Sequence, residues 1–248
     1  MNITKGELRN ELISHFLIHH NIKVFVASFE ESNAKTYKLV AGKVASKIFH
    51  DPKRDFDFKA YDIAGEKIKD KLMLLNLYQH AEWKSLREDI IQAVNEGAKA
   101  VFLDPITNLT DGVSSAEANT LLQSITQDLA AMALDMDFLA LMFCHLKAPD
   151  GHISGEQRDK FYREEKYIGL GNCDHEWGGN VYSNQFTGSR SMMRKCNFLI
   201  GLEGNKDPAL PDHIRNIRNL KLLEDREFGE SGVFPVYWSK DTGRFIEL

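Results

Sequence analysis

The sequence predicts an α/β fold, with a mostly parallel sheet flanked by helices and a β-hairpin near the C-terminus. Two continuous apolar runs carry this prediction: residues 99–103 lead into Asp104, and residues 138–144 lead into His145. They lie on either side of a helix-like stretch, which is typical of buried parallel strands joined by a crossover helix. Because ligands bind beyond the carboxyl ends of such strands, Asp104 and His145 are expected to face one crevice.

Alternating helical and extended patterns support this fold over the first half of the chain. Residues 4–20 carry Leu8, Leu12, Phe16 and Leu17 on one helical face, which predicts an amphipathic helix packed on a sheet. The elements predicted after it are, in order, a strand over 23–29, a helix from Ser32 to about residue 52, a partly helical segment over 53–71, a strand over 72–78, a helix over 82–96 ended by Gly97, and a helix over 116–134.

The second half of the chain begins with a segment of different character. Residues 148–187 are polar and show no clear period, which predicts a functional loop or a mobile lid. Beyond it, residues 197–202, 219–223 and 233–238 are predicted strands, and the last two are expected to form the hairpin. We expect residues 1–248 to form a single domain.

Composition narrows the classes of function. The net charge of −5 argues against a protein that coats nucleic acid over its whole surface, but it allows a local basic groove. The three cysteines form no CxxC pair, which favours a reducing compartment over a disulfide framework or a zinc site. No stretch approaches the ~20 apolar residues of a membrane span. We therefore expect a cytoplasmic protein without a membrane partner.

Acidic residues at strand ends are the first candidates for chemistry. Asp104 can hold Mg²⁺ through its waters while phosphates fill the remaining positions, although an aspartate here could also cap the turn before Pro105. Glu30 follows the strand over 23–29 and could polarise an attacking water, whereas Glu31 could cap the next helix. Together these residues indicate a nucleoside triphosphatase.

Basic residues are the second group of candidates. His145 with Lys147 could sense a γ-phosphate or contact a nucleic-acid backbone, and the alternative is a structural histidine at a strand end. Arg226 lies among acidic residues in a predicted turn, where it is either a solvated charge or an arginine offered to the phosphates of a neighbouring subunit. Arg190 and Arg194 could bind phosphodiester groups or merely cap a helix.

Five motifs, taken together, resemble those of one family over nearly the whole chain. They are VFVASFEES (24–32), AVFLDPITNL (100–109), LMFCHLKAPDG (141–151), FTGSR (186–190) and DREFGESG (225–232). Their order and spacing resemble the RecA-like motor domain of replicative DNA helicases. The likeness is greatest to the helicase half of bacteriophage primase-helicases and to the mitochondrial helicase Twinkle, and smaller to the bacterial DnaB-type enzymes.

The resemblance implies a role for each candidate. Glu30 matches the catalytic glutamate, Asp104 the Walker B aspartate, His145 the phosphate-sensing histidine and Arg226 the arginine finger. Lys147 and the loop after it match the part that faces DNA. The implied ligands are ATP or dTTP with Mg²⁺, and the implied partners are single-stranded DNA, further copies in a hexamer or other ring, and the primase and polymerase of a replisome. A phage-encoded chain would act in the cytoplasm of a bacterial host.

The chain also departs from the family pattern. Counting back from Glu30, the lysine of the phosphate-binding loop GxxxxGK[ST] falls on Lys5 and its hydroxyl residue on Gly6. The glycines of that loop have no counterpart in the four residues before Lys5. Glu224 stands where a lysine is expected, and Arg194 falls near an expected glutamine. We therefore expect a fragment, the product of an interrupted gene, or a relative that no longer hydrolyses nucleotide.

Two other functions remain open from the sequence. The first is a helicase-derived module that binds DNA or supports ring assembly without catalysis. The second is a recombinase-type or circadian-type ATPase, which shares the RecA-like fold but acts on a different substrate.

Overall fold

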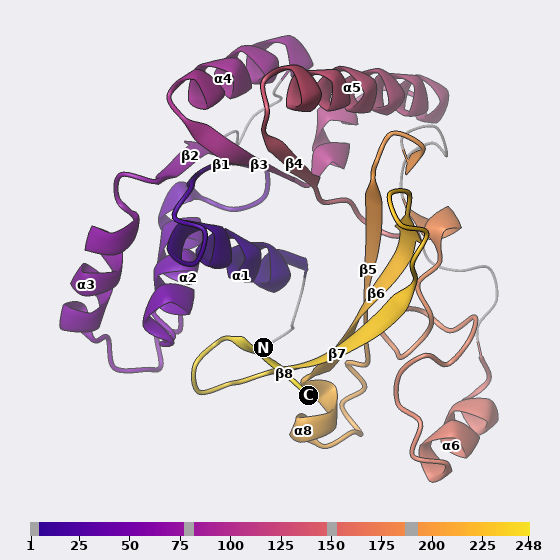
Figure 1. Ribbon diagram of the computed structural model, residues 1–248. Helices are drawn as coiled ribbons and strands as arrows, with labels where there is room; N and C mark the ends of the chain where they lie inside the picture. Colours follow the sequence, from indigo (N-terminus) through magenta and orange to yellow (C-terminus); the bar gives the residue numbers. More distant parts are fainter. Residues whose placement is uncertain (1–4, 77–81, 148–152, 187–192) are drawn as a thin grey trace.

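The protein is described here from a computed structural model that covers residues 5–76, 82–147, 153–186 and 193–248. It consists of two sheets with helices packed around the first (Figure 1). In chain order the elements are α1 (Lys5–Ile18), β1 (Lys23–Ser28), α2 (Asn33–Ala45), α3 (Phe58–Ile68), β2 (Leu72–Asn76), α4 (Trp83–Asn95), β3 (Ala98–Asp104), α5 (Ser115–Asp135), β4 (Leu139–Met142), α6 (Gly155–Arg163), β5 (Phe198–Gly204), α8 (Asp212–Arg215), β6 (Ile217–Asp225), β7 (Gly232–Trp238) and β8 (Phe245–Glu247).

The first sheet is parallel and has the strand order β2-β1-β3-β4. Its register sets Ser28 of β1 opposite Asp104 of β3, and Leu103 opposite Met142 of β4. The carboxyl ends of β1, β3 and β4 therefore lie at one edge of the sheet. This confirms the predicted parallel strands and the crossover through α5.

Helices cover both faces of this sheet, with α4 and α5 on one side and α1, α2 and α3 on the other (Figure 1). Leu103 of β3 joins the core formed with Ile90 of α4, whereas its neighbour Phe102 joins the core formed with Ile13 of α1. Successive side chains of a strand point to opposite faces, so β3 contributes to both cores. Truncation of the fully buried Phe102 to alanine is expected to cost roughly 3–5 kcal/mol.

Two sequence predictions are wrong in detail. The strand β4 is not fully buried, because it is the outermost strand of its sheet, and Leu139 is 48% exposed. Helix α2 ends at Ala45 and not near residue 52, because Ser46 takes a left-handed conformation and its backbone N–H donates to the last carbonyls of the helix.

The last four strands form a second, antiparallel sheet in the order β5-β6-β7-β8. The predicted hairpin is β6 and β7, in which Leu220 lies opposite Phe234. The strand predicted at 197–202 belongs to this sheet as β5. One face of β5 packs through Leu199 on Val181 and Phe186, which come from the segment before it.

That preceding segment, predicted as a structureless loop, contains regular structure in its described part. Helix α6 begins with a capping box, in which Ser154 and Gln157 satisfy each other's backbone amides. Isolated bridges join Leu146 to Phe186 and Trp177 to Asn205. The mobility of this segment stays a prediction.

A C-terminal turn ties the second sheet back to the helices of the first. The guanidinium of Arg244 donates to Oε1 of Glu11 in α1 at 2.7 and 2.9 Å, and the backbone N–H of Phe245 donates to Oε2 of the same residue. Lys43 of α2, itself buried, donates to the carbonyl of Gly243. The two sheets are therefore joined by contacts between the first helix and the last strand.

Candidate functional site

Four of the residues predicted from the sequence meet at the carboxyl edge of the first sheet. Asp104 is the last residue of β3, Glu30 follows β1, His145 follows β4, and Lys5 is the first residue of α1. The parallel register places the strand ends together, and α1 adds its N-terminus to them. We call Lys5, Glu30, Asp104 and His145 the strand-end cluster.

Lys5 contacts every other member of the strand-end cluster. Its Nζ lies 3.3 Å from Oδ1 of Asp104, 3.3 Å from Nε2 of His145 and 3.9 Å from Oε2 of Glu30. A lysine at the first position of a helix adds its charge to the positive end of the helix dipole. This position suits an anion such as a phosphate group.

Glu30 and His145 form the open side of the cluster. Nε2 of His145 lies 3.0 Å from Oε1 of Glu30, and the two side chains are 52% and 44% exposed. Both can therefore be reached by a ligand from solvent. A carboxylate in this position can accept a proton from water, and the imidazole beside it can donate to a phosphate oxygen.

Asp104 forms the closed side of the cluster and is only 4% exposed. Its Oδ2 accepts a hydrogen bond of 2.6 Å from Nη1 of Arg9. The alternative interpretation from the sequence, in which this carboxylate caps the following turn, is wrong because its hydrogen bond goes to Arg9. The partner of Asp104 thus comes from the helix that also carries Lys5.

Arg9 is the site residue that sequence reasoning missed. Its side chain is 1% exposed and bridges two carboxylates, because Nη2 donates to Oε2 of Glu31 at 2.6 Å while Nη1 contacts Asp104. Nη2 and Nε also donate to Oδ1 of Asn10. The available signal was an arginine four residues after Lys5, which places both on one side of a helix.

Glu31 is held as an anion by its neighbours. Burial by itself raises the pKa of this carboxyl, but a hydrogen bond from Lys35 together with the charge and hydrogen bond of Arg9 outweighs it and leaves the pKa lowered. The prediction that Glu31 caps α2 is wrong, because the side chain of Ser32 accepts the hydrogen bond from the backbone of Lys35. Glu31 belongs to the same charged network as Asp104.

The side chains around Asp104 do not fit a magnesium ion there. Oδ2 is taken by Arg9, and Oδ1 is a buried atom without a hydrogen-bond partner that lies 3.3 Å from the ammonium of Lys5. Magnesium prefers an octahedron of oxygen ligands, and Gly6 supplies no hydroxyl. Within the described ranges, no group of three or more His, Cys, Asp or Glu side chains could hold a metal ion.

The remaining predicted residues lie apart from the strand-end cluster. The guanidinium of Arg226 donates to the carbonyl of Arg194 and lies 3.3 Å from Oε2 of Glu224. Lys147 is exposed, and its backbone N–H donates to the carbonyl of Gln185. Arg190 lies outside the described residues.

Comparison with known proteins identifies the fold. No family model matches the chain, and no curated protein matches it. A solved structure of a helicase ATPase domain matches with a TM-score of 0.72 and 12% identity over 98% of this chain and 80% of that one. A DnaB-like replicative helicase, solved to show its interactions with primase, matches with a TM-score of 0.72 and 13% identity over 100% of this chain and 56% of that one.

The fold is that of a RecA-like helicase domain. This confirms the fold class predicted from the sequence motifs. The chain spans about half the length of the DnaB-like structure.

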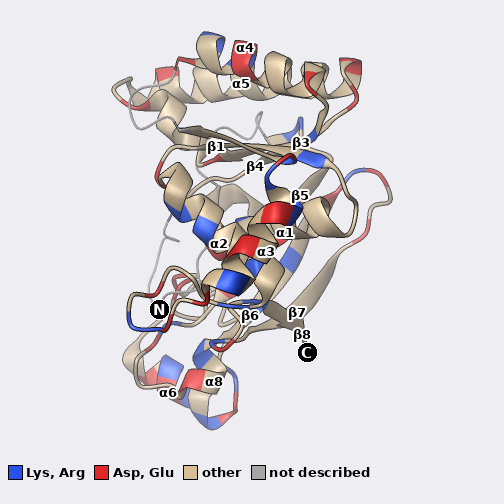
Figure 2. Cartoon of the chain, turned by 90° about the vertical axis from the view of Figure 1, so that its left-hand side faces the viewer, with Lys and Arg blue, Asp and Glu red and all other residues tan. Residues whose placement is uncertain are grey.

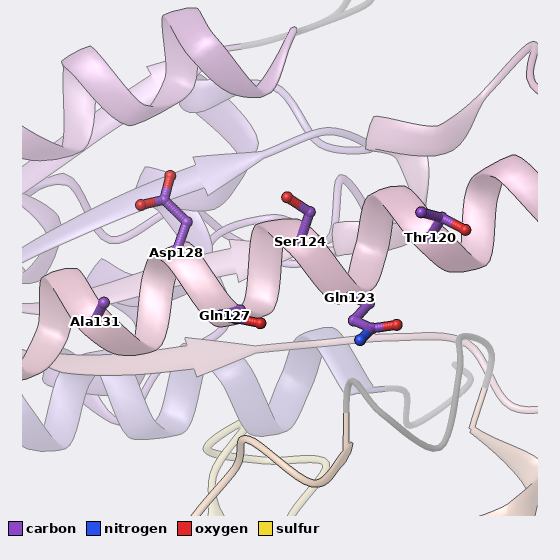
Figure 3. Close-up of a pocket in the computed structure, with 6 residues that line it drawn as sticks. All are labelled: Thr120, Gln123, Ser124, Gln127, Asp128 and Ala131. Carbon is purple, nitrogen blue, oxygen red and sulfur yellow. The ribbon is translucent and has the colours of Figure 1, made fainter.

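Other surfaces of this RecA-like domain offer less specific features. A shallow hollow of about 550 Å³ runs along α5, and its lining residues all come from that one helix (Figure 3). One of them, Asp128, is already paired with Arg87 and Trp83 of α4. Acidic and basic residues are interspersed on α1 to α3 (Figure 2). None of the helices in the described ranges is long and apolar enough to cross a bilayer.

Proposed function

We propose that this chain is the nucleotide-binding motor domain of a replicative DNA helicase. The observation that carries the proposal is the meeting of Lys5, Glu30 and His145 at the carboxyl ends of parallel strands. In open α/β sheets this is where ligands bind. The fold shared with the solved helicase ATPase domain supports the same conclusion.

Each residue of the cluster has a chemical task in this proposal. Lys5, at the N-terminus of α1, binds the terminal phosphates of ATP or dTTP. Glu30 orients and deprotonates the attacking water, and His145 contacts the γ-phosphate and reports its loss. Nucleotide use with Mg²⁺ is the general expectation for a helicase ATPase domain. Because the side chains described above leave such an ion no place at Asp104, no step is assigned to it.

The proposal extends to the assembly and to DNA. Arg226 is offered to the nucleotide of a neighbouring copy in a hexamer or other ring, and Lys147, Arg190 and Arg194 contact single-stranded DNA in its channel. Binding is then electrostatic and largely independent of sequence. Primase and polymerase of a replisome are the expected partners in the cytoplasm, and for a phage-encoded chain that is the host cytoplasm. The DnaB-like structure, solved with regard to its interactions with primase, supports the first of these.

Binding and hydrolysis of nucleotide test the proposal directly. ATP and dTTP would be offered to the chain as given and to a version with a GxxxxGKS segment rebuilt at its start, with and without single-stranded DNA. We expect nucleotide binding that is lost in Lys5→Ala, and hydrolysis stimulated by DNA in the rebuilt version. Lys99→Ala is the matched control, because Lys99 is an exposed lysine of β3 paired with Asp137. Folded protein that binds neither nucleotide nor DNA would contradict the proposal.

A second candidate function is a helicase-derived module that binds DNA or supports ring assembly without hydrolysis. Two observations favour it: Gly6 lacks the hydroxyl of the phosphate-binding loop, and Asp104 is already paired with Arg9. This candidate predicts salt-dependent binding of single strands by both versions of the chain, with hydrolysis by neither.

A further inference from the structure

We propose that Arg9 is a built-in cation that takes the place of a divalent metal ion at Asp104. The site then binds nucleotide phosphate through Lys5 with an affinity that does not depend on Mg²⁺. The second statement rests on the proposed function, whereas the first concerns only the side chains of this chain.

The burial of Arg9 is the first argument. A guanidinium is almost never fully buried unless it is paired, because its desolvation is costly. Arg9 is 1% exposed, and its two terminal nitrogens each lie 2.6 Å from a different carboxylate, that of Asp104 and that of Glu31. The guanidinium therefore lies between two acidic side chains, the position that a bound metal ion would take.

The balance of charge is the second argument. The cations Lys5, Arg9 and Lys35 are paired with the anions Glu30, Glu31 and Asp104. This network is neutral before any ligand binds. A divalent ion at Asp104 would add two positive charges beside Arg9, and like charges at such short range repel strongly.

The supply of ligands is the third argument. Oδ2 of Asp104 already accepts from Arg9, and its other oxygen, Oδ1, faces Lys5. Both oxygens of the carboxylate thus face cations of the protein itself. Gly6, next to Lys5, has no side chain with which to bind an ion. A phosphate group, in contrast, still has the ammonium of Lys5 as a partner.

Binding of Mn²⁺ without nucleotide tests the role of Arg9 directly. Electron paramagnetic resonance would count the free Mn²⁺ added to the wild type, to Arg9→Gln and to Arg9→Lys. We expect Arg9→Gln to bind Mn²⁺ about tenfold or more tightly than the wild type, the equilibrium factor of one charge-assisted hydrogen bond. Arg9→Lys keeps the charge and should show no gain. Equal affinity in the wild type and Arg9→Gln overturns the proposal.

Two further variants locate the effect and control for folding. In Arg9→Gln combined with Asp104→Asn the gain should disappear, because the carboxylate that binds the ion is gone; a gain that persists overturns the assignment to Asp104. Arg218→Met removes a second buried arginine, which lies in β6 of the other sheet, and should leave Mn²⁺ affinity unchanged. Thermal unfolding of each variant establishes that it is folded. If Arg9→Gln does not fold, Arg9→Ala replaces it.

Nucleotide affinity separates this proposal from the proposed function. The dissociation constant of ATP would be measured in EDTA and in excess Mg²⁺. We expect equal values for the wild type and at least about tenfold tighter binding with Mg²⁺ for Arg9→Gln. Tighter binding with Mg²⁺ in the wild type overturns the metal-independent site but leaves the proposed function intact. Absence of ATP binding in every variant overturns the proposed function, and the Mn²⁺ measurement still decides the role of Arg9.

Discussion

Nε2 of His145 lies 3.0 Å from Oε1 of Glu30, although 115 residues separate them in the chain. The contact exists because β1 and β4 both pair with β3 in parallel, so that the loops after them leave the sheet at one edge. The carboxylate proposed to activate water thus touches the imidazole proposed to contact phosphate. Movement of either side chain is felt by the other.

Glu30→Gln should separate nucleotide binding from hydrolysis. The amide keeps the size of the side chain but cannot accept a proton, so we expect unchanged nucleotide affinity and a rate of hydrolysis lower by about 10²–10⁴-fold in the version that hydrolyses. Steady-state phosphate release and equilibrium binding measure the two effects. Glu66→Gln, which alters an exposed glutamate of α3, is the control. Unchanged hydrolysis in Glu30→Gln would remove Glu30 from the catalytic role.

Arg226→Ala should act through the neighbouring subunit. An arginine finger contributes about 10³-fold or more to hydrolysis, so the variant alone should be nearly inactive in a ring. Mixing it with Glu30→Gln should restore part of the activity, because one partner then supplies Arg226 and the other Glu30 at the same interface. If the mixture stays inactive, Arg226 serves only its own subunit, as its contacts with Arg194 and Glu224 would allow.

The lowered pKa of Glu31 predicts a loss of stability in acid. A carboxyl whose pKa is lower in the folded than in the unfolded state stabilises the fold fully above its ordinary value of 4.5 and loses this contribution as the pH falls through the lowered folded value. We therefore expect the free energy of unfolding of the wild type to drop as the pH falls below 4.5, and that of Glu31→Gln to drop less. Denaturant unfolding at several pH values measures both. Parallel curves would show that Glu31 is not the group responsible.

Thiol chemistry offers a check on the core beside the strand-end cluster. Burial raises the pKa of Cys144 to about 12 and also raises the pKa values of Cys173 and Cys196. At about pH 8 the thiolate fraction of Cys144 is then roughly a thousandfold below that of a thiol with an ordinary pKa. The folded protein should react slowly with a thiol reagent, and all three cysteines should react at once in denaturant. Fast labelling of Cys144 in the folded protein would contradict its burial.

Much of the first sheet could be predicted from the sequence, because its strands are continuous apolar runs that end in polar residues. The placement of Asp104 and His145 at one edge follows from parallel pairing alone. The antiparallel pairing of β5 with β6 could not be predicted in the same way. Alternation of helices and strands favoured a continued parallel sheet, and the β5 partner lies across the turn that includes α8.

Arg9 was missed because the wrong face of α1 was expected to be buried. The leucine pattern placed Leu8 and Leu12 toward the sheet, whereas the structure buries Arg9 and Ile13 and leaves those leucines half-buried. An amphipathic pattern counts only apolar residues, so it cannot register an arginine whose burial depends on partners far along the chain. Those partners, Glu31 and Asp104, are brought to it only by the finished sheet.

Helix α1 has one more consequence, because its two ends serve different parts of the molecule. Its first turns carry Lys5 and Arg9 into the strand-end cluster, and two residues later Glu11 holds Arg244 and Phe245 from the final strand. A helix transmits displacement along its axis nearly as a rigid rod. A force on the antiparallel sheet is therefore delivered to the ammonium group that meets the phosphates, which makes α1 a short lever between the C-terminal hairpin and the nucleotide.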